Sequence, residues 1–85
     1  MAEFLVELYV SRSDSGAVER GAEHARLAVE ELTREGTPVC YLRSIFVPED
    51  ETCFYLYEAA SAEAVRKAAR RAALPFERVS AAVTE

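Results

Sequence analysis

Apolar and polar residues alternate along the first ten positions of the chain. Phe4, Val6, Leu8 and Val10 are apolar, and they alternate with positions that include Glu3 and Glu7. A period of two, with β-branched and aromatic residues on one side, is typical of a strand with one buried face. The pattern therefore predicts a strand over residues 3–10.

The repeat changes to a helical one after a polar loop at residues 11–16. The apolar positions are then spaced by four, three, four and three residues, which forms one stripe along a helix. This stripe consists of Val18, Ala22, Ala25, Val29 and Leu32. Gly36 is a favourable residue just beyond a helix end, and Pro38 cannot continue a helix. These features predict a helix over residues 17–35.

The remainder of the chain predicts two strands, a helix and a last strand. The strands at residues 39–47 and 52–58 are joined by an acidic turn, so they form an antiparallel hairpin. Ser61 is placed to cap a second helix, which ends before Leu74 and Pro75. Residues 76–83 form the last strand. The order strand-helix-strand-strand-helix-strand predicts a single ferredoxin-like βαββαβ domain over residues 1–85, with a four-stranded antiparallel sheet and two helices on one face.

Such a sheet has a second face that no helix of its own chain covers. A hairpin loop with an odd number of residues would keep Arg43 out of the core, and we take this register as the expectation. The open face would then hold all four tyrosines together with an acid and a base. The candidate ligand contacts are Glu7, Tyr9, Tyr41, Arg43, Tyr55 and Tyr57. This face would pack against a second copy in a homodimer or line a pocket for a small molecule, and the two roles are compatible.

Charge and hydropathy restrict the classes of partner. The chain has a formal net charge of −5, which argues against nucleic-acid binding because affinity for phosphates requires clustered lysine and arginine. The chain has no apolar run of the length that spans a membrane, and its acidic N-terminus does not resemble a signal peptide. We therefore expect a cytoplasmic protein that binds neither membranes nor nucleic acid.

The residues that could carry chemistry are few. The two cysteines, Cys40 and Cys53, are expected to be thiols, and the common motifs of catalytic sites are absent. The only histidine is His24, in the first helix next to Glu23. These two residues are the candidate metal ligands, and the site would be weak because tight sites need three or four converging donors.

Several short segments follow a known pattern: Tyr-Leu-Tyr-Glu-Ala at residues 55–59, Glu-Ala-Val-Arg at 63–66, Ala-Arg-Arg-Ala at 69–72, Leu-Pro at 74–75 and Arg-Val at 78–79. Through them the chain resembles, over nearly its whole length, a small bacterial ferredoxin-like family, long of unknown function, that has a nickel-binding member. The resemblance implies a non-enzymatic binding protein with nickel as the implied metal. Two positions depart from the family pattern: Ala68 replaces a common histidine, and Ala73 replaces a common glycine. The loss of the histidine argues against a tight nickel site.

An alternative function follows from the open face. Two such sheets facing each other would form a dimeric α+β barrel, as in some small oxygenases and isomerases. In that arrangement Glu7 would act as a base or carboxylate anchor, and Arg43 would bind an anionic group of a ligand. A third class is an interaction module that uses the basic second helix.

Overall fold

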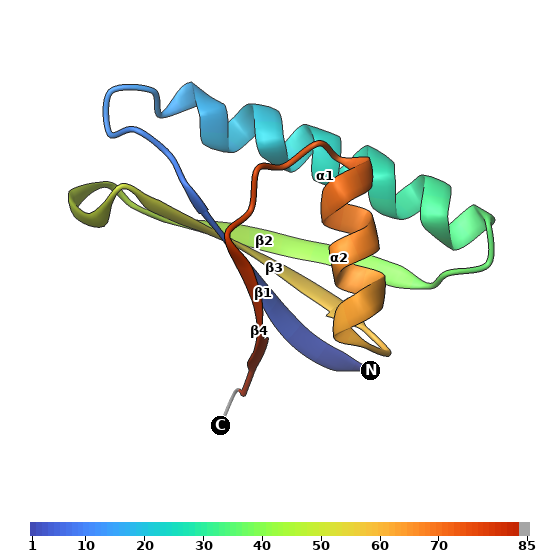
Figure 1. Cartoon of the computed structure of the whole chain (residues 1–85). Helices are drawn as coiled ribbons and strands as arrows, with labels where there is room; N and C mark the ends of the chain where they lie inside the picture. Colours follow the sequence, from blue (N-terminus) through green and yellow to red (C-terminus); the bar gives the residue numbers. More distant parts are fainter. Residues whose placement is uncertain (84–85) are drawn as a thin grey trace.

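The predicted order of elements is confirmed in the computed structural model, which describes residues 1–83 (Figure 1). The strands are β1 (Ala2–Tyr9), β2 (Val39–Val47), β3 (Thr52–Ala59) and β4 (Arg78–Ala82). The helices are α1 (Gly16–Arg34) and α2 (Ala62–Arg71), and a short 3₁₀ turn covers Pro48–Asp50. The fold is ferredoxin-like α+β, as the pattern predicts.

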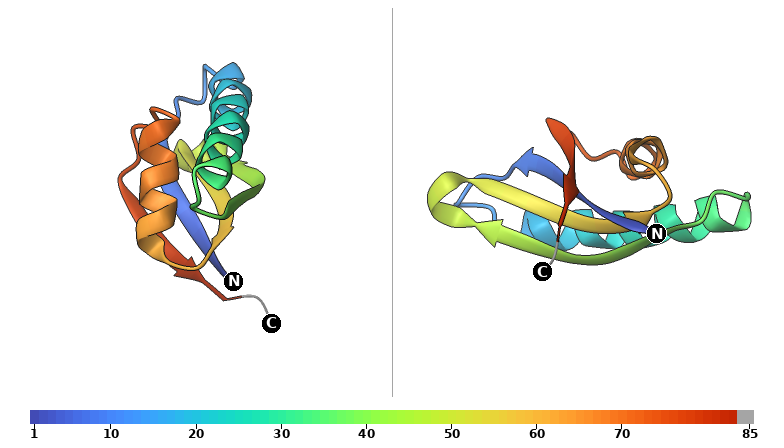
Figure 2. Two further views of the ribbon diagram at one scale, coloured as in Figure 1. Left: turned by 90° about the vertical axis from the view of Figure 1, so that its right-hand side faces the viewer. Right: turned by 90° about the horizontal axis from the view of Figure 1, so that it is seen from below.

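The four strands form one antiparallel sheet in the order β2-β3-β1-β4. Seen from below, the strands lie in front and α1 passes behind them (Figure 2, right). The helices cover one face and leave the other uncovered by this chain. None of the helices over residues 1–83 combines the length and the apolar character needed to cross a membrane.

The core lies between the helices and the covered face of the sheet. Four of the five predicted stripe residues of α1 are buried, and Val18 is half-buried; Gly21 and Ala28 are buried beside them. In α2 the buried residues are Val65, Ala68 and Ala69. The Ser61 hydroxyl caps α2 as predicted, because it accepts a hydrogen bond from the Ala64 amide at 3.2 Å. The small side chains along both helices let the backbones approach the sheet closely.

The expected register of the β2–β3 hairpin is wrong by one residue. Val47 pairs with Thr52, so the loop has four residues rather than an odd number. The loop closes with Glu51 in the left-handed conformation, at φ 48°. Because side chains alternate between faces, this single step exchanges the two faces of β3.

A β-bulge then changes the register a second time, between Tyr41 and Arg43 of β2. Tyr41 lies opposite Tyr57, whereas Arg43 lies opposite Leu56. A bulge adds one residue to one strand, so two residues that would normally share a face are placed on opposite faces. The bulge therefore turns Tyr41 toward the core. Arg43 follows Ile45 and Val47 in register and lies on the open face, as expected, although its neighbours there are Phe54 and Leu56 instead of tyrosines.

Both helices end in the same backbone motif, but with different residues in the left-handed position. After α1, the Thr37 amide bonds the Leu32 carbonyl at 2.8 Å, around Gly36 at φ 102°. After α2, the Leu74 amide bonds the Ala69 carbonyl at 3.0 Å, around Ala73 at φ 58°. This is the Schellman motif, in which glycine is the usual residue because a Cβ is strained there.

We expect Ala73→Gly to stabilise the protein by about 0.5–1 kcal/mol, because relief of the left-handed strain exceeds the entropy that glycine adds to the unfolded chain. The matched control is Gly36→Ala, which introduces the same strain where no atom lies within 4 Å of the new Cβ. It should destabilise by a similar amount. Urea unfolding measures both, and a loss of stability in Ala73→Gly would contradict the assignment of strain.

Candidate functional site

The open face of the sheet carries an apolar patch with charged groups beside it. The patch extends from the edge strand β2 across β3 to β1 and consists of Leu5, Ile45, Val47, Phe54 and Leu56. Ile45 is 45% exposed and Tyr9, at the end of β1, is 59% exposed. Leu56 is buried, and the other three are half-buried. In the described chain these apolar side chains face outward from the sheet, on the side away from the helices.

Three of the tyrosines expected on this face lie on the opposite side. Tyr55 and Tyr57 are fully buried against the helices, and Tyr41 is half-buried beside them. The Tyr41 ring packs edge-on against both, with centroids 5.8 Å and 5.6 Å away. The prediction that Tyr41, Tyr55 and Tyr57 contact a ligand on the open face is therefore wrong, because the even hairpin loop and the bulge turn them into the core. Only Tyr9 remains on the open face.

Tyr55 instead fastens β3 to α1. Its hydroxyl donates a hydrogen bond to the Val18 carbonyl at 2.8 Å. To reach that oxygen the side chain passes directly over Gly21: a Cβ built there would lie 2.1 Å from the Tyr55 hydroxyl oxygen. Gly21 is thus required by this close approach. The glycine in the middle of a predicted helix was the available signal, although its partner could not be identified from the sequence.

Tyr57 has no such partner. Its hydroxyl is buried and forms no hydrogen bond among the described residues. Burial raises the pKa of both Tyr55 and Tyr57 far above the usual range, because a low-dielectric environment disfavours the phenolate. Neither tyrosine is suited to act as a base at neutral pH.

Glu7 and Arg43 both lie on the open face, as predicted, but they are not adjacent. Glu7 is in β1 and Arg43 is in β2, with β3 between them. Neighbouring strands are about 4.8 Å apart, so the two side chains start from backbones roughly 10 Å apart. Arg78 of β4 donates a hydrogen bond to the Glu7 carboxylate at 2.9 Å. Glu7 and Arg43 can thus contact one ligand only if it spans the apolar side chains of β3.

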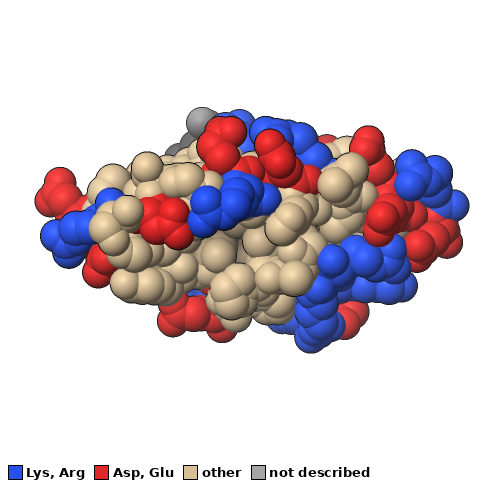
Figure 3. Space-filling view, turned by 90° about the horizontal axis from the view of Figure 1, so that it is seen from above, with Lys and Arg blue, Asp and Glu red and all other residues tan. Residues whose placement is uncertain are grey.

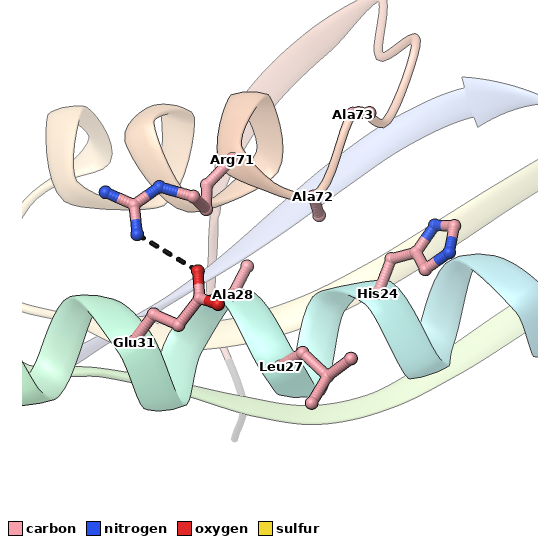
Figure 4. A pocket seen from close by; sticks show the side chains of 7 residues that line it. All are labelled: His24, Leu27, Ala28, Glu31, Arg71, Ala72 and Ala73. Atoms are coloured by element: carbon pink, nitrogen blue, oxygen red, sulfur yellow. Dashed lines mark hydrogen bonds and ion pairs between the residues drawn. The ribbon is translucent and has the colours of Figure 1, made fainter.

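His24 lies on the opposite side of the molecule, on the exposed surface of α1 near the end of α2 (Figure 4). It lines two cavities there, of about 300 Å³ and 360 Å³. The smaller one is bounded at its far end by Arg71, which pairs with Glu31 at 3.1 Å and with Glu35 at 2.9 Å. The hydrogen bond from Arg71 lowers the pKa of Glu35. These pairs hold the end of α2 on α1.

The helix side of the molecule carries charges of both signs. Figure 3 shows acidic and basic side chains interleaved around an uncharged area on the side seen from above. On α2, Glu63 pairs with both Arg66 and Arg70, at 3.4 Å and 3.7 Å. The basic second helix is thus partly neutralised by its own acid.

The donor set of one chain does not fit a complete nickel site. No three histidine, cysteine or acidic side chains are grouped anywhere in residues 1–83. Glu23 precedes His24 directly, and adjacent helix residues do not face each other. Cys53 is buried in the core and Cys40 is exposed. Ala68, where a histidine is expected from the family pattern, is fully buried and supplies no ligand.

Fold and open face together define a small ferredoxin-like α+β protein with one sheet face uncovered and no buried catalytic cluster among the described residues. A family described as nickel responsive protein SCO4226-like matches residues 9–81, and the chain belongs to this family. The resemblance seen in the sequence is thereby confirmed.

One solved structure is closely similar over the whole chain. It is the crystal structure of SCO4226 from Streptomyces coelicolor A3(2), which superimposes with a TM-score of 0.74 at 25% sequence identity and covers 99% of both chains. No curated protein matches the sequence. The fold and the family are therefore established by two independent comparisons.

Proposed function

We propose that the protein is a non-enzymatic binding protein that works as a homodimer, with the open faces of two sheets packed together. The observation that carries this proposal is the row of large apolar side chains on the open face, with Ile45 and Tyr9 strongly exposed. Contiguous apolar area of this kind on a soluble domain is characteristic of an interface or a ligand site. Membership of a nickel-responsive family agrees with a binding role.

The charges of the open face support pairing of two identical copies. Acidic Glu7 and Glu58 lie on the central strands, whereas basic Arg43 and Arg78 lie on the two edge strands. A two-fold axis presents the same face to itself, so self-pairing needs both signs on one surface. With acids in the centre and bases at the edges, a rotated second copy can bring opposite charges together.

The metal role that fits these residues is a weak one. An open-face dimer keeps the two copies of α1 on its outer sides, so the two His24 side chains cannot meet within it. Each His24 would then hold nickel through its imidazole, with water as the other ligands, because the adjacent Glu23 does not face it. Such a site lacks the three or four protein donors of tight sites.

A second candidate function is the binding of a small molecule between the two sheets. Its support is the placement of Glu7 and Arg43 on the same face, on either side of Phe54 and Leu56. A ligand with an apolar body and an anionic end would lie over β3 and reach Arg43. The Glu7–Arg78 pair would then form the opposite wall.

Native mass spectrometry of the untagged protein, before and after addition of Ni²⁺, tests these proposals together. We expect a mass of twice the 9.4 kDa chain. Ile45→Asp should yield a monomer, because it places a charge in the apolar patch of the interface. Leu27→Asp is the matched control: Leu27 is 60% exposed on α1, away from the open face, and this variant should stay dimeric.

Added Ni²⁺ should be retained weakly, and His24→Ala should abolish its retention.

A wild-type monomer at micromolar concentration would refute the dimer. Dissociation by Leu27→Asp with an intact Ile45→Asp dimer would move the interface to the helices. Tight nickel retention that survives His24→Ala would show that other residues bind the metal. A small molecule carried through purification would appear as added mass on the dimer and would favour the second function.

A further inference from the structure

The larger of the two cavities near His24 is assembled from three parts of the chain. It has a volume of about 360 Å³ and lies where the end of β1, the first half of α1 and the connection from α2 to β4 meet. This volume falls within the range of small-molecule sites. The cavity lies on the helix side of the sheet, and Tyr9, at the end of β1, lines it as well as the open face.

The cavity has a preformed apolar floor. Leu8, Val10 and Leu74 line it and are at most 8% exposed. Two backbone features hold the walls in place. The left-handed turn at Ala73 directs Leu74 and Pro75 across one side, and the contact of Gly21 with Tyr55 fixes the distance between α1 and the sheet. A rigid apolar floor lowers the cost of ordering a ligand.

The polar groups around the cavity mainly accept hydrogen bonds. The Tyr55 hydroxyl donates to the Val18 carbonyl, and Tyr55 is fully buried, so it forms part of the floor. The Asp14 carboxylate lies at the rim, where Arg20 holds it with contacts of 3.0 Å and 3.2 Å. The His24 imidazole lies on the wall shared with the smaller cavity. Because Arg20 neutralises Asp14, the rim offers acceptors without a net attraction for anions.

We propose that this cavity binds a small, mainly apolar molecule that carries one hydrogen-bond donor, such as a hydroxyl or amino group. The apolar body would rest on Leu8, Val10 and Leu74. The donor would bond to one of the two acceptors at the wall and rim, the His24 imidazole or the Asp14 carboxylate. This inference does not depend on the proposed dimer or on nickel binding.

Phenol is a suitable probe because it combines an apolar ring with one donor. Titration of ¹⁵N-labelled protein should produce saturable shifts of the Gly21, His24 and Ala73 amide signals. Anisole has the same ring but no donor, and it should bind roughly fivefold more weakly, the loss expected for one neutral hydrogen bond. Benzoate should bind no better than anisole. Shifts that never saturate, or that gather on β2 and β3 of the open face, would overturn the proposal.

Two variants test the position of the ligand. Ala17→Leu places a larger side chain into the cavity from a half-buried position of α1 and should abolish the saturable shifts. Glu19→Leu adds the same side chain at an exposed position outside the cavity and should leave phenol affinity unchanged. His24→Ala, at an exposed position, should weaken phenol binding at least roughly threefold through the lost polar contact. If phenol binding persists unchanged in both Ala17→Leu and His24→Ala, the cavity is not the site.

Discussion

Gly21→Ala is expected to destabilise the protein by roughly 3 kcal/mol, although alanine normally favours a helix by about 1 kcal/mol over glycine. The new Cβ would lie 2.1 Å from the hydroxyl oxygen of Tyr55 and 2.9 Å from its ring carbon Cζ. Either α1 must move away from the sheet or Tyr55 must leave its place and give up the bond to Val18. For a domain of this size we expect the melting temperature to fall by about 10–20 °C.

Two further variants separate this clash from a general intolerance of alanine. Gly16→Ala lies at the exposed start of α1, where the nearest atom to a new Cβ is the flexible end of Arg20 at 3.1 Å. It should leave stability unchanged or raise it. Tyr55→Phe removes the closer of the two contacts and alone should cost about 1 kcal/mol for the lost hydrogen bond. The double variant Gly21→Ala/Tyr55→Phe should lose less stability than the two single variants added together. Strict additivity in this double-mutant cycle would refute the contact between Gly21 and Tyr55.

Ala25→Asp is expected to cost about 4 kcal/mol and to leave a large unfolded fraction in a domain of ordinary stability. Ala25 is fully buried at the centre of the stripe of α1, so the carboxylate would enter the core without a partner. Leu27→Asp introduces the same residue two positions further on, where the side chain is 60% exposed. Leu27→Asp introduces the same low helix propensity without burying a charge, so it should lower the free energy of unfolding by less than about 1 kcal/mol.

Circular dichroism melts of the two aspartate variants provide the comparison. A lower melting temperature for Ala25→Asp alone would support the packing of the α1 stripe on the sheet. Equal melting temperatures would mean that the stripe does not face the core. The buried stripes of both helices consist mainly of small residues that pack closely on the sheet. Little space therefore exists there for an added carboxylate.

The elements of the fold were predictable because each has a local signal. The stripe of α1 repeats at helical spacing, Gly36 and Pro38 end that helix, and Ser61 caps the next one. In β1 the acids Glu3 and Glu7 mark the side that faces away from the core. These signals lie within a few residues of the features they determine, so a single sequence suffices to read them.

The open face was only partly predictable. Glu7, Tyr9 and Arg43 lie on it as expected, whereas Tyr41, Tyr55 and Tyr57 do not. In β3 both faces are apolar: Cys53, Tyr55 and Tyr57 alternate with Phe54 and Leu56, so polarity does not distinguish them. The preference for an odd loop placed the tyrosines with Arg43, and nothing in the local pattern reveals the bulge that separates Tyr41 from Arg43.

The sequence by itself therefore determined the order of the elements, the buried stripes of the helices, the faces of β1 and the family to which the chain belongs. The tertiary structure alone decided the register of the hairpin, and with it the residues that remain available for a partner. The physical reason is that register is a property of two strands and their loop. It depends on the left-handed residue Glu51, on the bulge in β2 and on the fit of the Tyr55 hydroxyl over Gly21, which joins residues that are 34 positions apart in the chain.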